Sequence, residues 1–206
     1  MMAASGTTLR GEERTRAQRE RILGAARACF VNSGFHAASM AQIAEAAAMS
    51  PGLIYRYFEN KSAIILAIIE DQLEVARARI RKMRAASDLA AGVLAHCRKR
   101  GESEEGTMSP ALFLEMSAEA TRDRQIGEAL RKFDATVREE LTRWLALDRD
   151  KGGYGLPPEL AETRSLMLVC LIEGLKVREA HDPDMNRDLM QRALAEVVST
   201  LTAAPQ

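Results

Sequence analysis

The side chains that could perform chemistry are few and scattered along this sequence. No two histidines or cysteines stand at the His-x-x-x-His or Cys-x-x-Cys spacing that holds a metal ion, and no glycine-rich phosphate loop is present. His96 and Cys97 are neighbours on a predicted helix, so their side chains point about 100° apart, which does not suit a nucleophile and its base. We therefore expect neither an enzyme nor a bound metal or cofactor. The histidines and cysteines are His36, His96, His181, Cys29, Cys97 and Cys170.

A different kind of chemistry is concentrated in the stretch SPGLIYRYFENK, residues 50–61. Its tyrosines, arginine and lysine can donate hydrogen bonds to phosphates, and its glycine allows a close approach of the backbone. Its isoleucine and phenylalanine, Ile54 and Phe58, in contrast, belong in a hydrophobic core. The stretch therefore raises the question of which side chains pack inward and which face a partner.

The elements that must position this stretch are helices. Nearly everything after residue 15 has helical periodicity, and no segment alternates with the two-residue period of a strand. Gly34 stands where a helix-ending glycine belongs, Ser39 is a predicted N-cap, and Ser50-Pro51 starts another helix. We expect an all-α chain of about nine helices. The predicted ranges are 16–34, a short helix after residue 39, another from residue 50, 61–84, 87–100, 109–121, 124–147, 158–181 and 186–203.

Residues 39–58 form two short predicted helices joined by a tight turn at 47–50. This is the pattern of a helix-turn-helix, in which the second helix enters the DNA major groove and the first braces the phosphates. A helical hairpin of another kind would show the same periodicity. The pattern alone therefore leaves DNA binding and ordinary packing both open.

The sequence around this motif resembles the N-terminal domain of the tetracycline-repressor-like (TetR) family of bacterial transcription regulators. The resemblance covers about residues 16–76 and departs at two places, where Ala48 replaces a usual turn glycine and Tyr57 a usual histidine. It implies a DNA-binding head at 16–76 and a ligand-binding and dimerisation domain at 77–206. The arginines before the head predict a flexible basic arm at 1–15, which either enters the minor groove or is only a solvated tail. The landmarks are Ile22-Leu23, Ala25-Ala26, Phe30, Gly34-Phe35, Ile43-Ala44, the run Ser50, Gly52, Tyr55 and Phe58, and Lys61.

The resemblance also implies a set of DNA contacts. Ala48 would need a positive φ if the turn keeps the family's shape, and Tyr57 lies on the flank of the core face, so packing remains an alternative for it. Arg56 is expected at either a phosphate or a guanine. The residues expected near phosphates are Ser39, Met40, Tyr55, Tyr57 and Lys61, and those expected near base edges are Gln42, Pro51, Gly52 and Leu53.

Charge and hydropathy are consistent with this interpretation but do not decide it. The formal net charge is 0 and the pI about 6.9, while residues 1–61 hold eight basic and five acidic side chains. The N-terminus lacks the apolar segment of a secretory signal, and the longest apolar run, 166–172, is too short to span a membrane. Three widely separated cysteines favour free thiols in a reducing cytoplasm.

For the C-terminal two-thirds the resemblance implies a repressor released from a palindromic operator by a small effector, which the apolar stripes predict to be largely apolar. Flexible methionines and these stripes mark a candidate pocket, although ordinary core packing explains the same residues. Glu173 is expected to pair with Lys176 or Arg178, to belong to a buried polar network, or to recognise a cationic ligand. The candidate ligand-binding residues are Met83, Met108, Phe113, Met116, Phe133, Met167, Cys170 and Glu173.

The last two predicted helices, 158–181 and 186–203, are the expected homodimer interface. The first of them is apolar nearly all round, so it needs cover on more than one side, and Gly174 would allow another helix to approach closely. An alternative to a small-molecule effector is a thiol-based redox sensor that uses Cys97 or Cys170. The identity of the effector, the operator and the target genes does not follow from the sequence.

Overall fold

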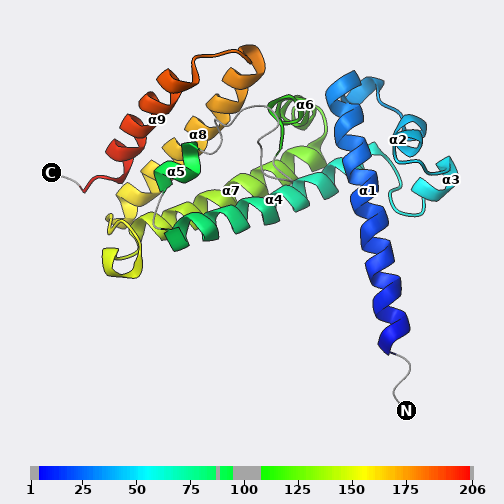
Figure 1. The fold of residues 1–206 in the computed structure, drawn as a ribbon, viewed down its shortest axis with the longest axis horizontal. Coiled ribbons are helices and arrows are strands. Elements are labelled where there is room, and N and C mark those ends of the chain that lie inside the picture. Colours follow the sequence, from blue (N-terminus) through cyan, green and yellow to red (C-terminus); the bar gives the residue numbers. More distant parts are fainter. Residues whose placement is uncertain (1–4, 87–88, 95–107, 205–206) are drawn as a thin grey trace.

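The computed structural model describes residues 5–86, 89–94 and 108–204. Its first element, α1 (Ser5–Ala37), begins well before the predicted start at residue 16, so residues 5–15 continue the helix where the sequence predicted a flexible arm. Glutamate, arginine and alanine favour helix there, and Arg16 pairs with Glu20 one turn later at 2.9 Å. The first half of α1 extends away from the rest of the molecule (Figure 1). Residues 5–15, predicted as a flexible arm, are therefore the first turns of α1.

Glycine decides how α1 ends. Gly34 has φ 75°, in the left-handed region that only glycine adopts without cost, and the helix kinks at this residue before its last turn. The kink directs the chain into α2 (Met40–Ala46), which the side chain of Ser39 caps as predicted. The next helix, α3 (Pro51–Ile54), starts at the predicted Ser50-Pro51, although the Ser50 hydroxyl makes no capping bond.

The long helix α4 (Lys61–Ala86) leads from this head into the rest of the chain, where it packs along α7 (Figure 1). α6 lies between the head and the C-terminal helices and contacts α1, α7 and α8. α8 packs on α7, and α9 follows it at the far end from the head. The remaining bounds are α5 (Leu89–Leu94), α6 (Pro110–Ala120), α7 (Arg124–Ala146), a 3-10 turn (Arg149–Lys151), α8 (Pro158–His181) and α9 (Arg187–Thr202).

The all-α prediction is confirmed, and the helices from α6 onward end within one residue of their predicted bounds. Of the helix predicted at 87–100, the structure describes 89–94 as helical, and the rest of that range, with Cys97, lies outside the described residues. Within the described part of the chain, no helix is both long and apolar enough to cross a membrane.

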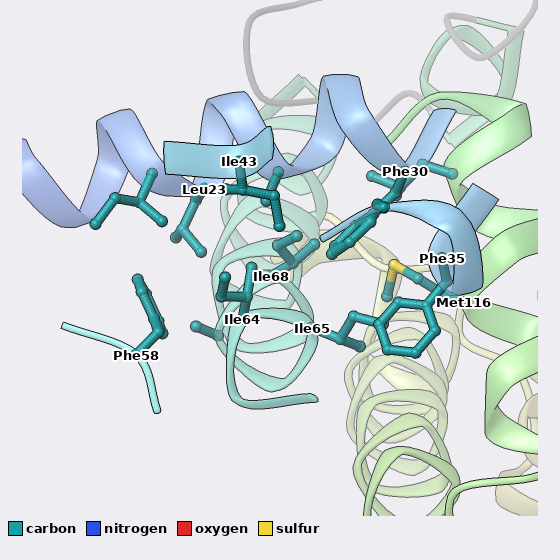
Figure 2. Packing of buried hydrophobic residues seen from close by; sticks show 14 of the residues in the cluster. Leu23, Phe30, Phe35, Ile43, Phe58, Ile64, Ile65, Ile68 and Met116 are labelled. Atoms are coloured by element: carbon teal, nitrogen blue, oxygen red, sulfur yellow. The ribbon is translucent and has the colours of Figure 1, made fainter. Parts of the chain in front are cut away.

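Two hydrophobic clusters hold these helices together. One joins the head to α6 and the start of α7, and the other joins the far ends of α4 and α7 to α5, α8 and α9. Figure 2 shows the first cluster, in which Met116 of α6 lies beside Phe35 of α1 and Ile65 of α4. Because Met116 is buried among head residues, the head and the C-terminal domain share one core at this point.

Candidate DNA interface and effector cavity

The stretch that begins α3 divides into a buried side and an exposed side. Ile54 and Phe58 are 0% and 4% exposed and belong to the head's core, as the sequence predicted. Tyr55 is 55% exposed, and Pro51, Gly52 and Arg56 are also exposed. Backbone hydrogen bonds continue helically past α3, with the Phe58 N–H donating to the Ile54 carbonyl at 3.0 Å. The exposed side is therefore a rigid surface that nothing in the described chain covers.

The turn before α3 is strained at Ala48. This alanine has φ 48°, the only non-glycine with a positive φ among the described residues, so the turn keeps the shape that usually calls for glycine. A left-handed alanine costs roughly 1–2 kcal/mol. Arg21 of α1 donates a hydrogen bond from Nη2 to the Ala48 carbonyl at 2.9 Å and so ties the turn to the head.

The start of α2 carries a reciprocal capping box. The Gln42 N–H donates to Ser39 Oγ at 3.2 Å, and the Ser39 N–H donates to Gln42 Oε1 at 2.8 Å. Both side chains are exposed. The oxygen of Gln42 is thus occupied, and its amide nitrogen remains the group with which Gln42 could meet a base edge.

Lys61 has a structural function that the sequence did not predict. Its ammonium donates hydrogen bonds to the carbonyls of Phe35, His36 and Ala38 at 2.7, 3.1 and 2.7 Å, and it lies 4.6 Å from the centre of the Phe35 ring. These carbonyls end α1, where a cation is favourable. Because an ammonium has three donors, a phosphate contact by Lys61 would compete with these bonds.

Arg19 also holds the head together. Its guanidinium lies 4.4 Å from the centre of the Phe58 ring and donates to the Tyr57 carbonyl at 3.2 Å. The Tyr57 side chain is half-buried and packs against the head's core, which the sequence had left open as an alternative to a phosphate contact. Met40 and Leu53 are half-buried in the same way. The exposed part of the predicted DNA face is therefore Ser39, Gln42, Pro51, Gly52, Tyr55 and Arg56.

A cavity of about 180 Å³ lies among α4, α6, α7 and α8. Its wall is mostly apolar, with a few polar and charged side chains. Six of the eight predicted ligand-binding residues line it, while Met167 and Cys170 do not and instead lie on the exposed face of α8. The six are Met83, Met108, Phe113, Met116, Phe133 and Glu173.

Two oppositely charged residues of α8 lie at this cavity, but they do not form an ion pair within 4.0 Å. Lys176 instead places its ammonium 4.6 Å from the centre of the Phe113 ring, and Arg178 pairs with Asp182 at 3.7 Å, so the pairing expected for Glu173 is not formed. Burial and the nearby Asp134 raise the pKa of Glu173. Burial lowers the pKa of Lys176.

α6 connects the cavity to the head. Phe113, Met116 and Ser117 of this helix line the cavity. On its other side, Glu115 accepts a hydrogen bond from the Phe35 N–H at 2.8 Å, and Glu119 lies 3.1 Å from His36. Nothing in the local sequence of α6 identified this pair of carboxylates, because their partners lie some 80 residues earlier in the chain.

Comparison with known proteins decides the family. Residues 22–68 match the family model described as "Bacterial regulatory proteins, tetR family", and residues 89–203 match "BetI-type transcriptional repressor, C-terminal". The HTH-type transcriptional regulator UidR of Escherichia coli K12 is 32% identical over 190 residues, which cover 90% of this chain and 94% of UidR. The chain belongs to the TetR family.

Solved structures agree with this TetR assignment. Salmonella enterica GusR matches with a TM-score of 0.71 and 28% identity over 90% of this chain and 94% of its own. A TetR-family regulator from Rhodococcus sp. matches with a TM-score of 0.72 and 21% identity, over 90% of this chain and 98% of its own, which shows the shared fold. The protein is therefore a helix-turn-helix transcriptional regulator and not an enzyme.

Within this TetR fold, α8 and α9 both carry exposed apolar side chains. Leu166 and Met167 of α8 are 46% and 50% exposed, and Leu189 and Val197 of α9 are 57% and 40% exposed. A side chain added at Gly174 would meet no atom within 4 Å. Exposed apolar residues on neighbouring helices are typical of an interface, although no partner chain is present.

The cysteines offer no second mechanism in the described residues. Cys29 and Cys170 are free, and Cys29 is half-buried in the head, where burial raises the pKa of its thiol. Cys97 lies outside the described residues. A raised pKa lowers the thiolate fraction and with it the reactivity of a thiol. The redox alternative was predicted for Cys97 or Cys170; Cys170 is a free, exposed thiol on α8, and none of the relatives' names or family descriptions supports a redox function.

Proposed function

We propose that this TetR-family regulator is a homodimeric repressor that a small molecule in the α4–α8 cavity releases from a palindromic operator. The observation that carries the proposal is that α6 contacts both the cavity and the DNA-binding head. One side of this helix lines the cavity, and the other holds the end of α1 through Glu115 and Glu119.

Met116 supplies the physical connection. It is 1% exposed, it lines the cavity, and it packs with Phe35 in the head's core (Figure 2). Close-packed cores transmit displacements because they contain few voids. A ligand that moves Met116 or Phe113 therefore shifts α6, and the carboxylate of Glu115 moves the end of α1 with it.

Linkage fixes the consequence for DNA. If the ligand-bound arrangement of the heads fits the operator less well, the ligand weakens operator binding, and operator weakens ligand binding by the same factor. Couplings of this kind are typically 5–150-fold. A cavity between the head and the dimer helices is well placed to exert such an effect.

The dimer is proposed from the apolar surface of α8 and α9. In a two-fold dimer the same patch of each subunit faces its copy, and four helices pack together. No described atom lies within 4 Å of a Cβ placed at Gly174, so a partner helix could approach the backbone closely there. A two-fold axis between the heads predicts an operator with two inverted half-sites.

The exposed side of α3 is the proposed reading surface. Tyr55 can donate to a phosphate, Arg56 to a phosphate or a guanine, and the backbone at Gly52 can approach closely. The N-terminus of α2, with Ser39 as its cap, suits a second phosphate. These roles rest on exposure and on the TetR resemblance together.

The proposal is tested on DNA from upstream of the protein's own gene. We expect the dimer to retard this DNA and to protect two inverted half-sites from cleavage. Tyr55→Phe should weaken binding about 5-fold, the effect of one lost hydrogen bond, while Tyr154→Phe, the same change in the far domain, should not. A monomer in solution, or a protected site without two-fold symmetry, would overturn the proposal.

A further inference from the structure

A half-buried lysine, Lys176, lies at the apolar cavity with no described carboxylate within 4.0 Å of its ammonium. The Lys176 ammonium has no hydrogen bond or ion pair with any described residue, and its contact is the ring of Phe113, 4.6 Å from the ring centre. Placing an ammonium in apolar surroundings without an anion is costly. The arrangement is therefore incomplete in the free protein, and an anion would complete it.

The charges around Lys176 come from three of the helices that line the cavity, α4, α7 and α8. Glu173 and Glu179 of the same helix favour its charged form, Arg79 of α4 opposes it, and burial, the largest influence, lowers its pKa. Asp134 of α7 acts on Glu173. Arg79 thus brings a second positive charge close enough to repel the ammonium.

A cationic ligand fits this arrangement poorly. The ring of Phe113, which would otherwise attract a cation, is already covered by Lys176. A second cation there would be repelled by both Lys176 and Arg79. Two carboxylates also line the cavity, but Glu173 is exposed to solvent, which leaves one half-buried acid, Asp134, against the two half-buried bases Lys176 and Arg79.

We propose that the effector is a small amphipathic anion: a carboxylate that pairs with Lys176, attached to a hydrocarbon body that fills the apolar wall. This deepens, and rests on, the proposed effector response. The apolar wall suits such a body, because Met83, Met108, Met116 and Phe133 line it and methionine adapts to irregular shapes.

The volume limits the size of this anion. An engineered cavity of about 150 Å³ holds benzene, so the 180 Å³ available here suits one ring or a short branched chain plus a carboxylate. Ser117 also lines the cavity, but its hydroxyl already donates to the Phe113 carbonyl at 2.7 Å, so Lys176 is the donor that we assign to the carboxylate.

The experiment uses matched probes on the full-length protein. Benzoate, phenylacetate and hexanoate are compared by isothermal titration with their neutral amides and with benzyltrimethylammonium. We expect at least one carboxylate to bind at least 10-fold more tightly than its amide. Lys176→Met should lower the affinity for that carboxylate to the affinity for its amide. Lys132→Met, the same change at an exposed lysine of α7, should leave the affinity for the carboxylate unchanged.

A second measurement does not depend on any variant. Because the carboxylate binds the charged form of Lys176, its affinity should fall as pH rises through the pKa of this lysine, with proton uptake on binding, whereas amide binding should stay flat. Carboxylates that bind no better than amides, tighter binding of the cation, or a carboxylate preference that survives Lys176→Met would each overturn the proposal.

These outcomes separate the anion proposal from the repressor proposal. Operator release by an amide or a cation, but by none of the carboxylates, would reject the anion and leave the ligand-released repressor intact. Tight carboxylate binding that leaves operator affinity unchanged would support the anion and reject its use as an effector.

Discussion

The carboxylate of Glu115 accepts a hydrogen bond from the backbone N–H of Phe35 at 2.8 Å, one residue after the kink in α1. This bond joins the cavity-lining helix α6 to the helix that supports the DNA-binding head. A Cβ added at Gly34 would lie 3.5 Å from the same carboxylate, so the kink and the acceptor are in contact. The relationship gives the head a direct attachment to the C-terminal domain.

Glu115→Ala should uncouple the head from the cavity. Removing the acceptor leaves the buried Phe35 N–H unpaired, so we expect a loss of about 1–2 kcal/mol in unfolding free energy, measured by urea denaturation. Ligand-induced release from operator should fall at least 5-fold at temperatures where the variant is folded. Glu128→Ala, which breaks only an exposed pair with Arg124, is the control. Full release by the Glu115 variant would show that the coupling runs elsewhere.

Lys61→Ala should destabilise the head. Three carbonyls at the end of α1 lose a charged donor, so we expect a loss of about 2 kcal/mol and a fall of about 4–8 °C in Tm. Lys132→Ala should leave Tm unchanged. The salt dependence of DNA binding distinguishes the alternative, since loss of a phosphate contact would reduce the slope by about 0.9 while Tm stayed near that of the parent.

Ala48→Gly should stabilise the protein. Glycine removes the steric cost of φ 48°, partly offset by its larger entropy in the unfolded chain, which leaves a gain of about 0.5–1 kcal/mol. Ala46→Gly, two residues earlier but inside α2, should lose about 1 kcal/mol. Thermal unfolding of both variants measures the difference. Equal losses in the two variants would contradict the assignment of strain to Ala48.

Lys176→Met should raise the stability of the ligand-free protein. Methionine has a similar shape and removes a buried charge, so we expect Tm at neutral pH to rise by about 2–4 °C, equivalent to about 1 kcal/mol. This would be a gain in stability at the expense of ligand binding.

The pH dependence has a definite sign. Burial holds the pKa of Lys176 below its ordinary value, so between the folded and unfolded pKa values the unfolded chain binds more protons. The wild type therefore gains stability as pH rises through that window, and the advantage of Lys176→Met should shrink. Urea denaturation at a series of pH values measures both. A constant difference would mean that Lys176 keeps its ordinary pKa.

The sequence by itself determined the parts of this protein that depend on local pattern. Helical periodicity and caps such as Ser39 predicted the helices, and the alternation of Ile54 and Phe58 with Tyr55 predicted the two sides of the segment 50–61. These signals act within about four residues, so they can be read without knowing the fold. The start of α1 at residue 5 was missed because a charged segment can be helix or coil with little difference in energy.

Only the tertiary structure decided which distant groups meet. In the folded chain the Lys61 ammonium donates to carbonyls at the end of α1, and Glu115 accepts a hydrogen bond from the Phe35 N–H. The Lys176 ammonium lies over the ring of Phe113. The fold also placed Met167 on the exposed face of α8, outside the cavity that the sequence predicted for it. The physical reason is that the rotation of one helix against its neighbours depends on packing across the whole core, which no single helix encodes.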